Sequence, residues 1–104
     1  MGLRTTIKRK ALEVVFDAIT EMFYHHVRNN PGCRLCEASA AVLPGNYGKQ
    51  SRLFASHVMD DLVKSERITK YKMDGKRYPQ FAVDHHAANQ AIDHELSRLH
   101  GVVL

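Results

Sequence analysis

Two cysteines stand three positions apart, Cys33 and Cys36, in the string CRLC. Thiols at this spacing can bind zinc or exchange with a disulfide, and a helix start at this point would lower their pKa values. A structural zinc site needs four ligands, and the chain has no second pair of this kind. Three interpretations stay open: a small buried apolar residue beside a helix-start residue, a disulfide, or a metal or redox sensor.

The chain has seven histidines, a large number for 104 residues. The pairs at 25–26 and 85–86 could complete a metal site only if the fold brought them together. His86 and His94 are eight positions apart, which is poor spacing for two ligands of one ion. We therefore predict neither a metal site nor a cofactor.

Catalytic patterns are also weak. Asp60 and Asp61 are adjacent, so on a helix they point about 100° apart and do not converge on one substrate. The segment PGNYGKQS, residues 44–51, superficially resembles a phosphate-binding loop, but it lacks the GxxxxGK[ST] spacing and no strand precedes it. The chain is not expected to be an enzyme.

Positive charge is concentrated in one stretch. The net charge is +4, and residues 49–77 hold eight lysines and arginines against four acidic residues. Many of these cations lie in ITKYKMDGKRYPQF, residues 68–81, where Asp74-Gly75 is a strong signal for a two-residue hairpin turn. This register would place Lys72 opposite Arg77, Tyr71 opposite Tyr78 and Ile68 opposite Phe81. A basic hairpin suits contact with a polyanion.

Helices must position this hairpin. Apolar spacing predicts helices over 7–28, 33–43 and about 49–65, separated by breaks at 29–32 and 44–46. Asp84 is a plausible N-cap for a last helix that ends near Gly101. In the first helix one apolar stripe is expected, opposite Glu13, Asp17 and Glu21; its residues are Ile7, Ala11, Val14, Val15, Ala18, Ile19, Met22 and Phe23. The residues expected to face the core are Phe54, Ala55, Val58, Met59 and Leu62 of the third helix and Ile68, Phe81 and Val83 of the hairpin.

This order of elements, with Leu62 near the end of the third helix and Ile68 opening the hairpin, resembles the winged helix-turn-helix family over about residues 7–83. Glu66 departs from the pattern, because the family often has a glycine there. The small size and the added terminal helix are similar to compact regulators encoded by archaeal viruses and plasmids. The resemblance implies a mainly α fold with a β-hairpin wing (α+β), with a domain over 1–83 and a dimerisation helix over 84–104.

Site residues follow from this interpretation. A helix fits the major groove of DNA, and a basic hairpin can reach phosphates or the minor groove. The predicted DNA contacts are Tyr47, Lys49, Gln50, Arg52, Ser56 and His57 on the third helix, and Lys70, Lys72, Lys76 and Arg77 on the wing. The expected function is sequence-specific binding of double-stranded DNA by a transcriptional regulator.

Two alternatives stay open. The charges could form a solvated face, or the domain could be a protein-interaction module that docks through the same surfaces. Exposed apolar residues on the third helix would favour docking, and Leu53 is the one candidate there.

Spare apolar surface predicts a homodimer. The last helix carries an apolar stripe that, with part of the first helix, exceeds what one small core needs. A two-fold dimer would place two recognition helices in successive major grooves, roughly 34 Å apart. Otherwise the last helix would fold back on the first helix of its own chain. The predicted dimer contacts are Ala88, Ile92, Leu96, Leu99 and Val103.

The expected location is the cytoplasm. No apolar run approaches the ~20 residues needed to cross a membrane, and the N-terminus lacks the apolar segment of a signal peptide. No membrane partner is expected.

Overall fold

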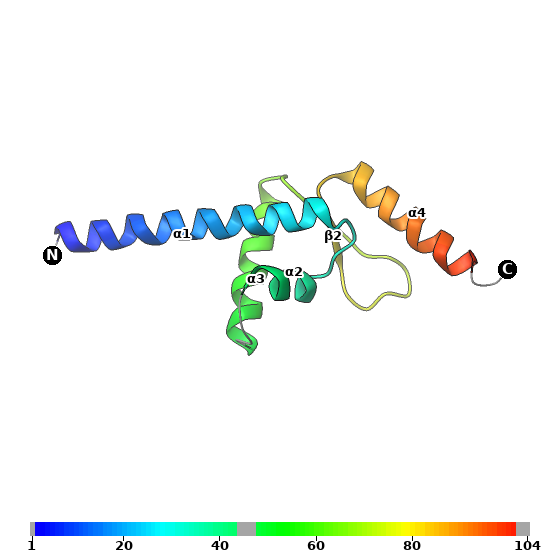
Figure 1. Cartoon of the computed structure of the whole chain (residues 1–104), viewed down its shortest axis with the longest axis horizontal. Helices are drawn as coiled ribbons and strands as arrows, with labels where there is room; N and C mark the ends of the chain where they lie inside the picture. Colours follow the sequence, from blue (N-terminus) through cyan, green and yellow to red (C-terminus); the bar gives the residue numbers. More distant parts are fainter. Residues whose placement is uncertain (1, 44–47, 102–104) are drawn as a thin grey trace.

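A computed structural model describes residues 2–43 and 48–101, and the side chains of residues 13–43 and 51–99. Three helices, α1 (Gly2–Asn29), α2 (Leu35–Val42) and α3 (Gly48–Lys64), precede an antiparallel hairpin of β1 (Thr69–Tyr71) and β2 (Gln80–Ala82). Helix α4 (His85–Gly101) follows (Figure 1). The predicted order of elements and the mainly helical α+β class are confirmed. No helix in the described residues is both long and apolar enough to cross a membrane.

The first helix has two apolar faces, not the single apolar stripe predicted. The packed face consists of Phe16, Ile19, Phe23 and Val27, of which Phe23 and Val27 are fully buried. The bare face consists of Val14, Val15, Ala18 and Met22, all of which are exposed, Val14 by 67%. At 100° per residue the mean directions of the two sets are about 130° apart around the helix. The residues predicted to form one apolar stripe are therefore divided between two faces of the helix.

Helix α2 begins two residues later than predicted because Cys33 pairs with the hairpin instead. The amide of Phe81 donates to the Cys33 carbonyl at 2.9 Å, and the Gly32 amide donates to the Phe81 carbonyl at 2.8 Å. Gly32 has a φ of +89°, a left-handed conformation that glycine adopts at little cost. The helix then starts with a capping interaction, in which the Arg34 amide donates to Glu37 Oε1 at 2.8 Å.

The end of α3 explains how the chain turns into the hairpin without the expected glycine. The amides of Glu66 and Arg67 donate to the carbonyls of Val63 and Leu62, each at 3.0 Å. This pattern is a Schellman motif, and it requires the left-handed conformation that Glu66 adopts, with a φ of +62°. The turn thus has the usual Schellman geometry, but a glutamate occupies the left-handed position that glycine adopts at lower cost.

The hairpin register differs from the prediction. Thr69 pairs with Ala82, Lys70 with Phe81 and Tyr71 with Gln80, so the second strand is shifted by two residues. The tight turn does form, since the Lys76 amide donates to the Met73 carbonyl at 3.1 Å, but the ladder ends at Tyr71. Pro79 has no amide hydrogen, so it cannot donate a hydrogen bond to the ladder. Phe81 also pairs with Cys33, and its partner on β1 is Lys70 and not the predicted Ile68. The basic residues after Tyr71 therefore belong to a loop, 72–79.

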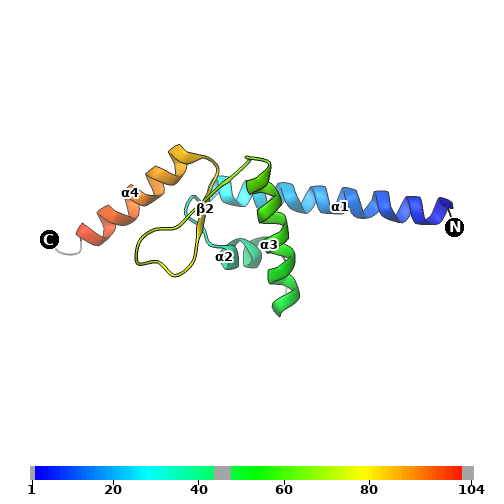
Figure 2. The ribbon, with the colours of Figure 1, turned by 180° about the vertical axis from the view of Figure 1, so that it is seen from behind.

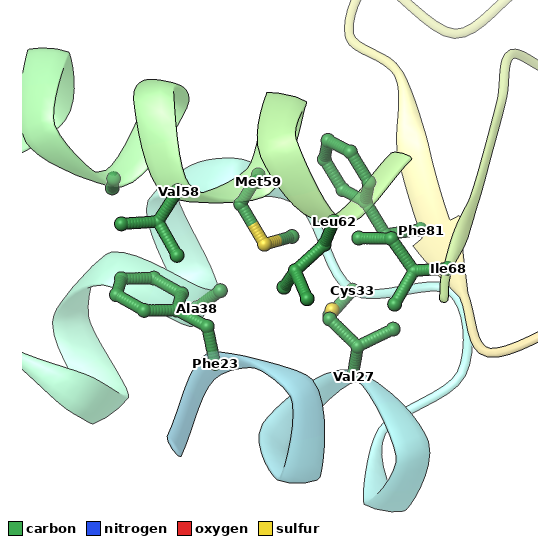
Figure 3. Packing of buried hydrophobic residues seen from close by; sticks show 10 residues of the cluster. Phe23, Val27, Cys33, Ala38, Val58, Met59, Leu62, Ile68 and Phe81 are labelled. Carbon is green, nitrogen blue, oxygen red and sulfur yellow. The ribbon is translucent and has the colours of Figure 1, made fainter. Parts of the chain in front are cut away.

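The core lies where α1, α2, α3 and the hairpin meet (Figure 3). Phe23 and Val27 of α1 face Val58, Met59 and Leu62 of α3. Ile68 and Phe81 close the hairpin side of the core, as predicted, whereas Val83 is only half-buried.

Helix α4 packs beside the hairpin and not along α1. Asp84 caps it as predicted, with Oδ1 accepting a 2.8 Å hydrogen bond from the Ala87 amide. Ala88 is buried where the helix meets the strands. The first part of α1 and the last part of α4 extend in opposite directions (Figures 1 and 2), which gives the molecule an extent of 68 × 28 × 19 Å.

Candidate nucleic-acid interface

The two predicted halves of the interface lie on the same side of the molecule. Helix α3 and the loop 72–79 both extend away from α1, and the short helix α2 lies between them (Figures 1 and 2). Ser39 of α2 and Ser51 of α3 are in contact, with their hydroxyls 3.5 Å apart. The buried residues Ala55, Val58, Met59 and Leu62 fix which side of α3 faces outward.

The structure separates the residues predicted on α3. Tyr47 lies outside the described residues, and the side chains of Lys49 and Gln50, in the first turn of α3, also lie outside them. Arg52 and Ser56 line a groove between α3 and the hairpin.

His57 points the other way, toward α1. Its ring meets Phe16 edge-on with centroids 6.0 Å apart, and Nε2 lies 3.7 Å from Asp61 Oδ2. Arg52 and His57 are five positions apart, which places them about 140° apart on a helix. The prediction that both lie on one face of α3 is therefore wrong.

Leu53 occupies the centre of the outward surface of α3. Its side chain is 71% exposed, the largest value among the large apolar residues of the described chain. A leucine in this position can meet a thymine methyl group or an apolar patch on a protein.

The cations of the predicted wing differ in exposure and in whether they already form an ion pair. Lys70 is exposed on β1 and lines the same groove as Arg52, while Lys72 and Arg77 are exposed in the loop. The Arg77 guanidinium lies 5.5 Å from the centre of the Tyr78 ring.

Lys76 is already partly neutralised. Its Nζ lies 3.0 Å from Glu95 Oε1 on α4, and Arg98 Nη2 contacts the same oxygen at 2.9 Å. The hydrogen bond from Lys76, supported by the charge of Arg98, lowers the pKa of Glu95, so this carboxylate stays ionised beside the wing. Lys76 is consequently the weakest of the predicted phosphate contacts.

Arg34, which precedes α2 and reaches the same region, was not predicted as a site residue. It lines the groove with Arg52 and also borders a polar cleft of about 580 Å³ beside Lys76 and Arg77. Its Nε lies 3.3 Å from Glu37 Oε1. The string Arg-x-x-Glu at a predicted helix start was the available signal, because the glutamate caps the helix and holds the arginine near it.

The cysteines do not behave as a pair. Cys33 is buried and Cys36 exposed, and both are free thiols. Burial raises the pKa of Cys33 to about 11, the opposite of the lowered value that a redox switch needs. The described residues contain no group of three histidine, cysteine or acidic side chains arranged to hold a metal ion. The interpretation of Cys33 as a small buried apolar residue fits this geometry best.

The residues predicted to form the dimer interface differ in burial. Ala88 is buried within the chain and Ile92 is half-buried, while Leu96 and Leu99 are exposed. Val103 lies outside the described residues.

Another cation fastens α1 to the turn before β1. Arg67 Nη1 lies 2.6 Å from Glu21 Oε1, and its guanidinium stacks 4.4 Å from the centre of the Tyr24 ring. The hydrogen bond from Arg67 lowers the pKa of Glu21. Arg67 is therefore a structural residue and not part of the basic surface.

The chain matches no protein-family model, no curated protein and no solved structure.

Proposed function

We propose that the protein binds double-stranded DNA as a dimeric transcriptional regulator of the winged helix-turn-helix type inside the cell. In this proposal the first half of α3 enters the major groove and the loop 72–79 follows the phosphate backbone. The observation that carries it is that α3 and the basic loop extend on one side of the molecule and share a groove lined by Arg52 and Lys70.

Charge supports this assignment. Among the described residues, neither Arg52 nor Lys70 has a carboxylate within ion-pair distance, so neither must break a contact to reach a phosphate. Lys72 and Arg77 add two exposed cations on the same side. Arg52 suits a guanine edge, because its guanidinium can donate two parallel hydrogen bonds to O6 and N7.

In the proposed dimer, the second subunit binds the second half of the DNA site. Outside the proposed DNA-binding side, the large apolar side chains exposed in the described residues are Leu96 and Leu99 of α4 and those of the bare face of α1. Ile7 and Ala11 continue the spacing of the bare face by threes and fours toward the N-terminus, which is the pattern of a helix that pairs with another helix. The interface of the dimer combines these two surfaces.

The test is fluorescence anisotropy with random-sequence duplex DNA across a salt series. The double variant Arg52→Ala/Lys72→Ala removes two unpaired cations from each subunit, hence four from the dimer, so the magnitude of the negative slope of log K against log salt should fall by about 3.6. Lys64→Ala, in the last turn of α3, is the matched control and should leave the slope unchanged. A folded protein that fails to bind DNA at low salt would overturn the proposal.

The exposed Leu53 favours one second candidate, a module that docks on another protein. In that case DNA binding is absent, and Leu53→Asp abolishes capture of the partner while Arg52→Ala does not.

A further inference from the structure

The groove between α2, α3 and the hairpin has an apolar floor and a charged rim. Its volume is about 330 Å³, which is within the range of small-molecule sites. Leu35, Met59 and Phe81 form the floor, and Pro79 closes the side toward the loop. Met59 and Phe81 belong to the core, so the floor is fixed by packing and does not need a ligand to form.

The charges on the rim favour an anion. Arg34, Arg52 and Lys70 line the groove, against one carboxylate, that of Asp60. The guanidinium of Arg34 already contacts Glu37, whereas Arg52 and Lys70 have no ion pair within the described part of the chain. Two free cations thus stand over an apolar floor.

We infer that this groove binds a small free carboxylate with an apolar body of about ten non-hydrogen atoms. The size follows from the volume, since each water occupies about 30 Å³ in the liquid. The apolar body covers the surface that Leu35, Tyr78 and Pro79 leave exposed in the groove, and the carboxylate accepts charge-assisted hydrogen bonds from Arg52 and Lys70. This assignment goes beyond DNA binding and does not require it.

One consequence does rest on the proposed function. Arg52 and Lys70 are also proposed DNA contacts, so a carboxylate in the groove competes with DNA for them. An effector of this kind would release the protein from DNA.

Cys36 provides a readout of the groove that is independent of DNA. This thiol lines the groove and is exposed. Cys33 is buried, and its pKa of about 11 leaves it almost entirely protonated at neutral pH. Iodoacetamide should therefore label the native protein once, at Cys36, and a ligand in the groove should slow that reaction.

The test compares octanoate, which has about ten non-hydrogen atoms, with octanamide, its neutral isostere, and with acetate, which lacks the apolar body. Labelling of Cys36 is followed by mass spectrometry, and affinity by titration calorimetry. Octanoate should bind with a Kd on the order of a millimolar or tighter and slow labelling several-fold. Octanamide and acetate should each bind at least about fivefold more weakly, because each lacks one of the two parts.

Variants identify the cations. Arg52→Gln should weaken octanoate binding by roughly three- to tenfold, the value of one charge-assisted hydrogen bond. Lys64→Gln is the matched control on the same helix and should bind octanoate as the parent does. Circular dichroism checks that each variant is folded.

Three results would overturn the inference. They are equal protection by octanoate and octanamide, no protection by octanoate, and unchanged octanoate affinity in the double variant Arg52→Gln/Lys70→Gln. None of these readouts involves DNA, so a failure of the proposed regulator would leave them unaffected.

Discussion

The packed face and the bare face of α1 are both apolar, but only the packed face is buried. The packed face buries Phe23 and Val27 against α3, and Phe16 meets Phe54 edge-on at 6.0 Å. The bare face carries Val14, Val15, Ala18 and Met22, whose side chains contact solvent. Both sets follow helical spacing, so periodicity shows that a residue will be on an apolar stripe but not which partner the stripe will meet.

This difference shows what a core of this size can hold. The core takes one face of α1 because α2, α3 and the hairpin can cover only one side of a helix (Figure 3). Small domains bury a limited fraction of their surface, and an apolar stripe left over is typical of an interface. The bare face is therefore where the proposed dimer can be tested.

The largest effect is expected from adjacent residues on the two faces. Phe23→Ala removes a fully buried ring and should lower the free energy of unfolding by about 3–5 kcal/mol. Met22→Ala, at a side chain that is 51% exposed, should change it by less than about 0.5 kcal/mol at low protein concentration. Urea unfolding measures both. Similar losses in the two variants would mean that the bare face is buried in the monomer.

The next effect concerns the dimer. Val15→Asp and Leu96→Asp each place a carboxylate on a surface assigned to the interface. Each should weaken dimerisation at least about tenfold, since burying an unpaired charge costs several kcal/mol. Sedimentation velocity over a range of concentrations measures this. If Val15→Asp leaves the dimer intact while Leu96→Asp dissociates it, the interface consists of α4 alone.

The smallest effect is expected from a substitution that stabilises the packed side of the molecule and leaves the bare face unchanged. Glu66→Gly relieves the left-handed backbone at the end of α3 and should raise the free energy of unfolding by about 0.5–1 kcal/mol. The dimer dissociation constant should stay the same, because Glu66 lies in the turn to β1 and is not among the residues assigned to the interface. Ser65→Gly, one position earlier, is the control and should destabilise the helix end. A loss of stability in Glu66→Gly would show that the conformation at this residue is not strained.

Much of the fold was predictable from local signals. The order of elements, the Asp84 cap and the burial of Ile68 and Phe81 follow from periodicity, capping chemistry and β-propensity. The hairpin register was not predictable, because it depends on Cys33, a residue about fifty positions away that pairs with Phe81. Local turn chemistry predicted the turn at Asp74-Gly75 but not where the ladder would stop.

The candidate site was predictable in part for a similar reason. The excess of cations in 49–77 marks the side of the molecule that carries the groove. Which cations are free depends on neighbours from other elements, as with Lys76 and Glu95 or Arg67 and Glu21. Such pairs join residues distant in the sequence, so no local pattern predicts them.

The bridge between Cys33 and Phe81 also bears on how the chain assembles during synthesis. Residues 2–43 can form α1 and α2 early, but the hairpin side of the core closes only when Phe81 pairs with Cys33. Until the ribosome has released residue 82, Phe23 and Val27 lack part of their cover. Contacts of this sequence separation slow folding and leave apolar surface exposed for longer. The order in which the protein is made thus sets a period during which part of its packed face is still uncovered.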